Sequence, residues 1–246
     1  MKFEEILKPN NNPYEITLGY NENKTLKTNI YENASILITG ATGTSKSILM
    51  HEILLQLINS LKNNIKILPI AFNKVELREY ADSKYSDSPL ISDIDEAIKS
   101  LKQINNLILE RKKKFLENNV NNYQDYIKIK NEPFLVIAID EASSLLENKT
   151  AINEIFKIAD NCNKLGIAII INTNNVYNNF FEKDLNLCFS NKISFDFSDK
   201  EQSILNNIKN SQNLNLRKFL IKKENRTYEY TIYEFDENDI NKILNN

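Results

Sequence analysis

Residues 35–47 read SILITGATGTSKS, an apolar run followed by a loop that contains two glycines and ends in Ser-Lys-Ser. The apolar run Ser35–Thr39 is typical of a buried strand. After the loop, apolar residues recur at helical spacing from Ile48 to Leu61. A strand, a loop and a helix in this order form the setting in which glycine-rich loops bind phosphate groups.

The loop from Gly40 to Ser47, called the phosphate loop below, has the residue types that phosphate binding needs. Glycines let the backbone curl so that successive N–H groups point at one anion, and the following helix N-terminus adds partial positive charge. Lys46 is predicted to reach the β- and γ-phosphates and to act in catalysis, and the Ser47 hydroxyl to bind Mg²⁺. The alternative is a turn of similar composition. The predicted ATP-binding residues are Gly40, Ala41, Thr42, Gly43, Thr44, Ser45, Lys46, Ser47 and Ile48.

Ser45 is the departure from the usual pattern G-x-x-x-x-G-K-[ST], which has glycine before the lysine. If this position is left-handed, serine there costs on the order of 1–2 kcal/mol. Strain of that size weakens nucleotide binding without abolishing it.

The composition narrows the class of protein. The chain has 246 residues, of which 41% are hydrophobic and 26% charged, enough for one large α/β domain. It has only 4 glycines, where an average chain would have about 17. Two cysteines and one histidine, with no C-x-x-C pair, argue against a structural zinc site or a disulfide framework. A net charge of −2 argues against a protein that coats nucleic acid.

We expect a cytoplasmic chain without a direct membrane span. No segment has the roughly 18 uninterrupted apolar residues that a transmembrane helix requires. The polar N-terminus, Met1 to Asn12, does not resemble a secretory signal.

Strand-like and helix-like segments alternate along the chain, which predicts an α/β fold with a mostly parallel central sheet and helices on both faces. A C-terminal antiparallel hairpin extends this sheet, and Tyr14–Leu18 is predicted as an edge strand that ends at a turn at Gly19. We expect a single domain over residues 1–246, with its core at about 14–245. The other predicted strands are Ile65–Phe72, Phe134–Ile139, Ile167–Ile171, Asn191–Phe197, Phe219–Lys222 and Thr227–Phe235. The helices include a long one opened by a Ser92-x-x-Asp95 capping box, one over Ile152–Ala159 with Gly166 as its C-cap, and one over Asp199–Ile208.

Two further strand ends carry polar residues. Asp140 and Glu141 follow the apolar run Phe134–Ile139. Asp140 is predicted to hold Mg²⁺ together with Ser47, and Glu141 to orient and deprotonate the attacking water; the alternative is an acidic helix cap. The second strand end is the run from Asn172 to Asn175. Asn174 is predicted to sense the γ-phosphate, and an asparagine-rich loop without that role is the alternative.

Several short matches share their order and spacing with one known family. They are Ile36–Gly43 with Lys46-Ser47, Lys74–Leu77, Pro89–Asp93, Glu110–Lys112, Ile139–Glu141, Gly166-Ile167 and Thr173-Asn174. Together they resemble the FtsK/SpoIIIE family of hexameric, RecA-like P-loop motor ATPases, in which the last of these strands ends in Ala-Thr-Gln. The resemblance implies a ring-forming ATPase that moves double-stranded DNA, in style similar to conjugative coupling proteins.

The departures from the family pattern concern hydrolysis. The family usually has an arginine three residues before the glycine of the Gly166-Ile167 pair, acting in trans on a neighbour's nucleotide, and here the residue is Asn163 with Lys164 beside it. Such an arginine is worth on the order of 10³–10⁵ in rate. The family's Gln-Arg-Pro is Asn174-Asn175-Val176, and its Asp-Pro-Lys is Ala71-Phe72-Asn73. The resemblance therefore implies a slow ATPase or one that needs a partner subunit.

Three functions remain open at this point. The first is a DNA translocase or a coupling ATPase that works with a membrane-bound transfer apparatus. The resemblance implies that it assembles as a homo-oligomer, a hexamer. The second is a protein-export module similar to type VII secretion ATPases, and the third is a nucleotide-binding scaffold that hydrolyses weakly. Lysines 112–114 and 222–223 are candidate DNA contacts only, and a solvated charged face is the favoured explanation of each run.

Overall fold

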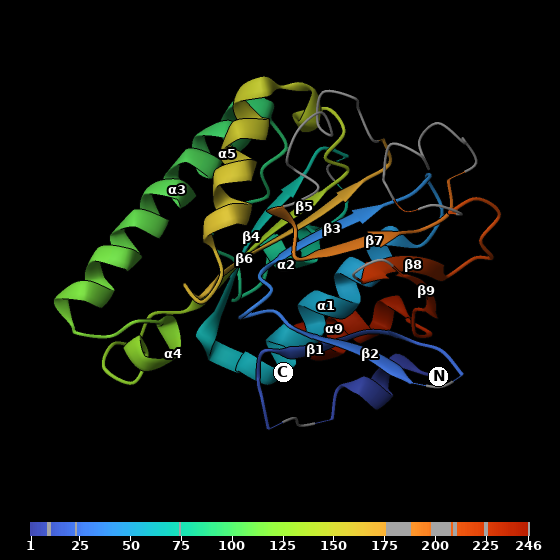
Figure 1. Ribbon diagram of the computed structural model, residues 1–246, viewed down its shortest axis with the longest axis horizontal. Coiled ribbons are helices and arrows are strands. Elements are labelled where there is room, and N and C mark those ends of the chain that lie inside the picture. The colour runs from blue at the N-terminus through green and yellow to red at the C-terminus, as the bar shows by residue number, and fades with distance from the viewer. Residues whose placement is uncertain are drawn as a thin grey trace.

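The computed structural model describes residues 1–8, 11–22, 24–73, 75–175, 188–197, 208, 211–223 and 226–245. Within these residues the strands form one sheet in the order β2-β1-β9-β8-β7-β3-β6-β5-β4 (Figure 1). The strands are β1 (Glu15–Tyr20), β2 (Thr25–Asn29), β3 (Ser35–Thr39), β4 (Ile65–Ala71), β5 (Phe134–Asp140), β6 (Ile167–Thr173), β7 (Asn191–Ser194), β8 (Lys218–Lys223) and β9 (Arg226–Thr231).

The half of the sheet from β7 to β4 is parallel, as predicted. Every residue of β3, β5 and β6 is buried, which explains their continuous apolar runs. In the register Thr39 pairs with Thr173, and Ile139 pairs with Ile171. The carboxyl ends of β3, β6 and β5 therefore meet at one edge of the sheet, where the phosphate loop begins.

The other half is antiparallel. β8 and β9 form the predicted C-terminal hairpin. The prediction of an edge strand at Tyr14–Leu18 was wrong, because β2 pairs outside β1 and takes the edge. The polar sequence TLKTN of β2 hid it, since Leu26 alone among its five residues is buried.

Gly19 is not a turn, as the sequence suggested, but lies within β1. A Cβ atom at this position would lie 2.8 Å from the Phe219 ring and 2.8 Å from the Thr231 carbonyl oxygen. Close approach to β8 and β9 therefore explains the glycine.

The helices lie on both faces of the sheet (Figure 1). On one face α3 packs against α5, and on the other α1 packs against α9 and the sheet. The helices are α1 (Lys46–Leu61), α2 (Arg78–Ala81), α3 (Ile94–Glu117), α4 (Tyr123–Tyr126), α5 (Lys149–Asn161) and α9 (Glu237–Leu244), with short 3₁₀ turns η1 (Phe3–Ile6), η2 (Lys62–Asn64) and η3 (Leu145–Glu147).

Two predicted helix caps were assigned to the wrong residue. The N-cap of α3 is Asp93 instead of Ser92, and its side chain accepts a hydrogen bond of 3.0 Å from the Glu96 amide. Helix α5 ends at Asn161 with Cys162 as its C-cap, so Gly166 is not the cap. Gly166 has φ +72°, and a Cβ atom there would lie 2.3 Å from the Tyr123 ring. Packing against α4 and a left-handed backbone explain this glycine.

Some predicted features lie outside the described residues. They are the helix over Asp199–Ile208 apart from Ile208 itself, the hairpin turn at Glu224-Asn225, Lys74 and Val176. Among the helices that are described, none combines the length and apolar character needed to cross a bilayer.

Candidate active site

The phosphate loop joins β3 to α1 through three residues with positive φ. Gly40, Gly43 and Ser45 have φ of +147°, +80° and +77°. A Cβ atom on Gly40 would lie 2.7 Å from the Phe195 Cβ, whereas one on Gly43 would meet no atom within 4 Å. Glycine at position 43 is therefore required by the backbone alone, and Ser45 carries the left-handed strain that its position in the motif suggested.

Lys46 is held within the phosphate loop. Its ammonium group donates a hydrogen bond of 2.8 Å to the Ala41 carbonyl oxygen, which also accepts 2.7 Å from the Thr44 hydroxyl. The Ala41 amide in turn donates to the Asp196 carbonyl at 2.7 Å. Burial lowers the pKa of Lys46 to about 8, against the opposing charges of Asp140 and Glu141.

Ser47 and Asp140 approach each other from α1 and β5, as the sequence predicted for two residues of one metal site. The Ser47 Oγ lies 3.5 Å and 3.4 Å from the two carboxylate oxygens of Asp140. Asp140 is 1% exposed, and burial, followed by the charges of Glu76 and Glu141, raises its pKa to about 6. A carboxylate and a hydroxyl beside it are oxygen donors of the kind that Mg²⁺ prefers.

Asn172 lies between these two residues. Its Nδ2 donates to the Ser47 Oγ at 3.3 Å and also to the Asp140 carboxylate. Its Oδ1 is buried and has no hydrogen-bond partner among the described residues. The sequence marked the run from Asn172 to Asn175 as polar but directed attention to Asn174, because nothing in a strand pattern shows that Asn172 faces two other motifs.

Asn174 reaches the phosphate loop from the end of β6. Its Nδ2 donates to the Thr42 hydroxyl at 3.3 Å, and its Oδ1 accepts a hydrogen bond from the Ser143 hydroxyl. Ser143 also lies 3.1 Å from the Thr173 hydroxyl. Ser143 was not predicted, since a serine in the loop after Glu141 carries no signal of its own.

Glu141 follows β5 in a left-handed conformation with φ +50°. Its charge raises the pKa values of both Asp140 and Lys46. The next amide, that of Ala142, donates to the Asn172 carbonyl at 2.9 Å and so joins this turn to β6.

A second cluster, formed by His51, Glu76 and Tyr80, lies beside the first. His51 is one helical turn beyond Ser47, and its ring nitrogens lie 3.0 Å from the Tyr80 hydroxyl and 3.3 Å from Glu76 Oε2. The hydrogen bond from His51 lowers the pKa of Glu76, against the effect of burial. The sequence by itself assigned no role at the site to His51. The structure places it in a hydrogen-bonded set whose carboxylate acts on Asp140.

Asn163 and Lys164 do not lie at this site. They precede β6 and therefore lie at the opposite edge of the sheet from the phosphate loop. The Asn163 Oδ1 accepts a hydrogen bond of 2.9 Å from the Ala34 amide, and the Lys164 side chain is exposed. Neither residue can reach the nucleotide site of its own chain.

The candidate DNA-contact lysines of α3 have partners on the protein. Lys112 donates to Asn161 at 2.7 Å, Lys113 lies 3.8 Å from Glu117, and Lys114 lies 3.3 Å from Glu132. This arrangement favours a solvated charged face for these residues. Lys222 of β8 is half-buried and contributes, after burial, to the lowered pKa of Lys192.

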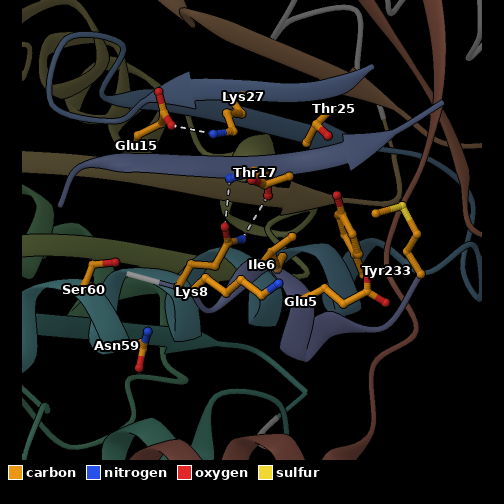
Figure 2. Close-up of a pocket in the computed structure, with 12 residues that line it drawn as sticks. Glu5, Ile6, Lys8, Glu15, Thr17, Thr25, Lys27, Asn59, Ser60 and Tyr233 are labelled. Atoms are coloured by element: carbon orange, nitrogen blue, oxygen red, sulfur yellow. Dashed lines mark hydrogen bonds and ion pairs between the residues drawn. The ribbon is translucent and has the colours of Figure 1, made fainter. Parts of the chain in front are cut away.

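A pocket of about 410 Å³ lies away from these residues, between η1, α1 and the β1–β2 hairpin (Figure 2). Several of its polar side chains are paired with one another. Gln56 forms hydrogen bonds of 2.8 and 2.9 Å with the Thr17 backbone, and Lys27 forms an ion pair of 2.8 Å with Glu15. The phosphate loop, with its strained backbone and converging strand ends, is the stronger candidate for the functional site.

Comparison with known proteins agrees with this geometry. Residues 7–175 match the model of the FtsK/SpoIIIE family. The DNA translocase FtsK of Bacillus cereus is 27% identical over 153 residues, which cover 56% of this chain and 19% of that protein. The chain thus spans about a fifth of the length of this curated relative.

Solved structures share the fold over nearly the whole chain. The pCW3 conjugation coupling protein TcpA, in a monomer form with ATPγS, has a TM-score of 0.84 at 21% identity, covering 98% of this chain and 72% of that one. EssC (ATPases 2 and 3) from Geobacillus thermodenitrificans has a TM-score of 0.78 at 18% identity, covering 94% of this chain and 47% of that one.

Proposed function

This chain belongs to the FtsK/SpoIIIE family, and from that membership we propose that it is an ATP-binding, ATP-hydrolysing motor domain over residues 1–246, with its core at about 14–245. One observation carries the proposal. Ser47, from the phosphate loop, and Asp140, from the end of β5, converge to 3.4 Å beside a buried lysine. Two oxygen donors and a lysine at the end of a glycine-containing loop are what nucleotide phosphates and Mg²⁺ need.

Each group at the site then has a role. The phosphate-loop amides and Lys46 would bind the β- and γ-phosphates, and Ser47 and Asp140 would hold Mg²⁺. The metal, when bound, would neutralise charge on the β- and γ-phosphate oxygens. Glu141 would orient and deprotonate the attacking water. Asn174 would contact the γ-phosphate from β6, supported by its bond to Thr42 in the phosphate loop.

The position of Lys164 supports a proposed oligomer. Because Asn163 and Lys164 lie at the sheet edge opposite the phosphate loop, a residue there reaches a nucleotide only on a neighbouring copy. We propose a ring, a hexamer by family membership, with nucleotide between subunits. Lysine lacks the planar fork of arginine and replaces it poorly, so we expect slow hydrolysis.

The substrate that we propose is double-stranded DNA, moved through the ring or delivered to a membrane-bound transfer apparatus from the cytoplasm. The name of the Bacillus cereus relative, DNA translocase, and that of the coupling protein TcpA support this choice. The fold shared with EssC favours one alternative, a protein-export ATPase that takes a peptide instead of DNA.

An ATPase assay with and without double-stranded DNA tests this function, together with a mass measurement in solution. We expect DNA to stimulate hydrolysis, and the stimulation to fall steeply with salt because phosphate contacts release counterions. A rate of ATP hydrolysis that DNA leaves unchanged at low and moderate salt would favour the protein-export alternative.

The nucleotide site is tested separately. We expect Lys46→Ala to lose affinity for ATP, since the buried ammonium group is the cation of the phosphate loop. Lys130→Ala, which changes an exposed lysine far from the loop, is the matched control. An ATP titration of Lys46→Ala that superimposes on that of the control would disprove the role of the phosphate loop.

A further inference from the structure

We propose that Asn172 is a positioning residue of the magnesium site, whose carboxamide holds the Ser47 hydroxyl and the Asp140 carboxylate in the arrangement that binds the metal. The inference rests on the proposed function, because it concerns the same Mg²⁺. It assigns a role to a residue outside the phosphate loop and the Asp140-Glu141 pair.

The strand order places Asn172 where it can act on both residues at once. β6 lies between β3, which leads into the phosphate loop, and β5, which ends at Asp140. Asn172 pairs in register with Ile38 near the end of β3, and it is 1% exposed. Its side chain therefore lies between the start of α1 and the end of β5.

The hydrogen bonds of Asn172 join the two candidate metal-binding residues. One Nδ2 group donates to the Ser47 Oγ at 3.3 Å and to the Asp140 carboxylate. The direct approach of Ser47 to Asp140, at 3.4–3.5 Å, is long for a hydrogen bond between oxygens. The amide therefore joins the two groups through a single nitrogen, in addition to their own contact.

Electrostatics explains why a donor is needed here. Asp140 is buried and repelled by the charges of Glu76 and Glu141. A hydrogen bond to an ionised carboxylate is about twice as strong as one between neutral groups. The Asn172 amide donates to Oδ1 of Asp140 and so leaves Oδ2 as the oxygen available to a cation.

Asparagine is unfavourable for stability in a buried strand, so its presence at position 172 is explained by a role of its side chain. Its Oδ1 has no partner among the described residues, and an unpaired buried acceptor destabilises the fold. The five strand residues before it, Ile167–Ile171, are all apolar. An apolar residue would suit packing better, so the two bonds made by Nδ2 are the feature that distinguishes asparagine.

The test measures the Mg²⁺ concentration that gives half-maximal binding of a fluorescent ATPγS analogue to the full chain. Residues that orient a metal ligand typically change metal affinity by about 10- to 100-fold when they are removed. We therefore expect Asn172→Ala to raise the required Mg²⁺ at least about tenfold, with nucleotide affinity in EDTA unchanged. Asn191→Ala is the matched control, because Asn191 is also a buried strand asparagine that donates its amide to a hydroxyl, that of Thr28, away from the site.

A second variant guards against a folding defect. Asn172→Leu keeps the branched shape of the side chain but has no donor, and circular dichroism checks that each variant is folded. The same rise in the required Mg²⁺ is expected for it.

The inference fails if both variants need the same Mg²⁺ as wild type, or less, since a lower requirement would mean that the amide competes with the metal. If nucleotide binding by the wild-type chain does not depend on Mg²⁺, both the proposed metal site and the inference are wrong. Mg²⁺-dependent binding that Asn172→Ala leaves unchanged overturns the inference alone.

Discussion

The two edges of the parallel sheet use similar polar residues in different ways. At the carboxyl edge, Ser47, Asp140 and Asn172 bond to one another through their side chains. At the amino edge, Arg111 donates to the carbonyl oxygens of Leu165, Gly166 and Pro133. Asn163 likewise bonds to backbone, the amide of Ala34.

This difference separates function from stability. Bonds between side chains are a minority in folded proteins, and they can be exchanged for bonds to a ligand without moving the chain. Bonds from a side chain to buried backbone tie segments together, because breaking them leaves a buried polar group unpaired. Substitutions at the carboxyl edge should therefore change binding and catalysis, and those at the amino edge should change stability.

The largest effect is expected at the carboxyl edge for Glu141→Gln. Removing a general base costs on the order of 10²–10⁴ in rate, so turnover should fall by at least about 100-fold while ATP binding and the free energy of unfolding stay close to wild type. Steady-state hydrolysis and a nucleotide titration measure both. Glu147→Gln, at an exposed position in η3, is the control. Equal turnover in the two variants would remove Glu141 from the mechanism.

At the amino edge, Arg111→Ala should destabilise the fold. Arg111 is 2% exposed, lies 3.0 Å from Glu132 and donates to three carbonyl oxygens. Removing one partner of a buried ion pair costs about 3–5 kcal/mol. Urea unfolding should show this loss, and Arg226→Ala, at an exposed position in β9, should show little. A stable Arg111→Ala variant that fails to bind nucleotide would break the distinction between the edges.

Glu52 is a buried carboxyl group away from both edges of the sheet, and it tests whether such a group makes stability depend on pH. It is fully buried in α1. Burial raises the pKa of Glu52 well above its ordinary 4.5, and a hydrogen bond with the Tyr233 backbone and the charge of Arg217 only partly oppose this. A carboxyl group whose pKa is raised on folding stabilises the fold at pH values below its unfolded pKa of 4.5. This stabilisation is lost as pH rises through the pKa of the folded state.

The melting temperature of wild type should therefore decline with rising pH more than that of Glu52→Gln, which has no carboxyl group to ionise. Glu32→Gln, at an exposed position, should keep the wild-type slope. Parallel curves for wild type and Glu52→Gln would show that this carboxyl does not govern the pH dependence.

The smallest effect is expected for Ser45→Gly. Glycine removes left-handed strain of about 1–2 kcal/mol. It also raises the conformational entropy of the unfolded chain, which lowers stability by about 0.4–1 kcal/mol. A gain of roughly 0 to 1.6 kcal/mol in unfolding free energy should remain. Ser60→Gly, near the C-terminal end of helix α1, should instead lose about 0.5 kcal/mol. Loss of stability in both variants would contradict the strain assigned to Ser45.

Much of the fold follows from local patterns. Continuous apolar runs marked β3, β5 and β6 because strands buried on both faces need no polar residues. The spacing of the phosphate loop identified Gly40, Gly43, Lys46 and Ser47 because backbone curvature and charge must occur at fixed offsets. The same reasoning failed at Gly19 and Gly166, where the deciding contact comes from a distant segment, and at β2, whose mostly polar residues hid the strand.

What the sequence by itself determined is the type of fold, the phosphate loop and the acidic strand end, since each depends on residues that are neighbours in the chain. Only the tertiary structure decided that Asn172 joins Ser47 to Asp140, that Ser143 supports Asn174, and that His51 pairs with Glu76. Asn172 and Ser47 are 125 positions apart. No periodicity or spacing encodes such a contact, because it depends on the order of strands in the sheet and on which face each side chain meets.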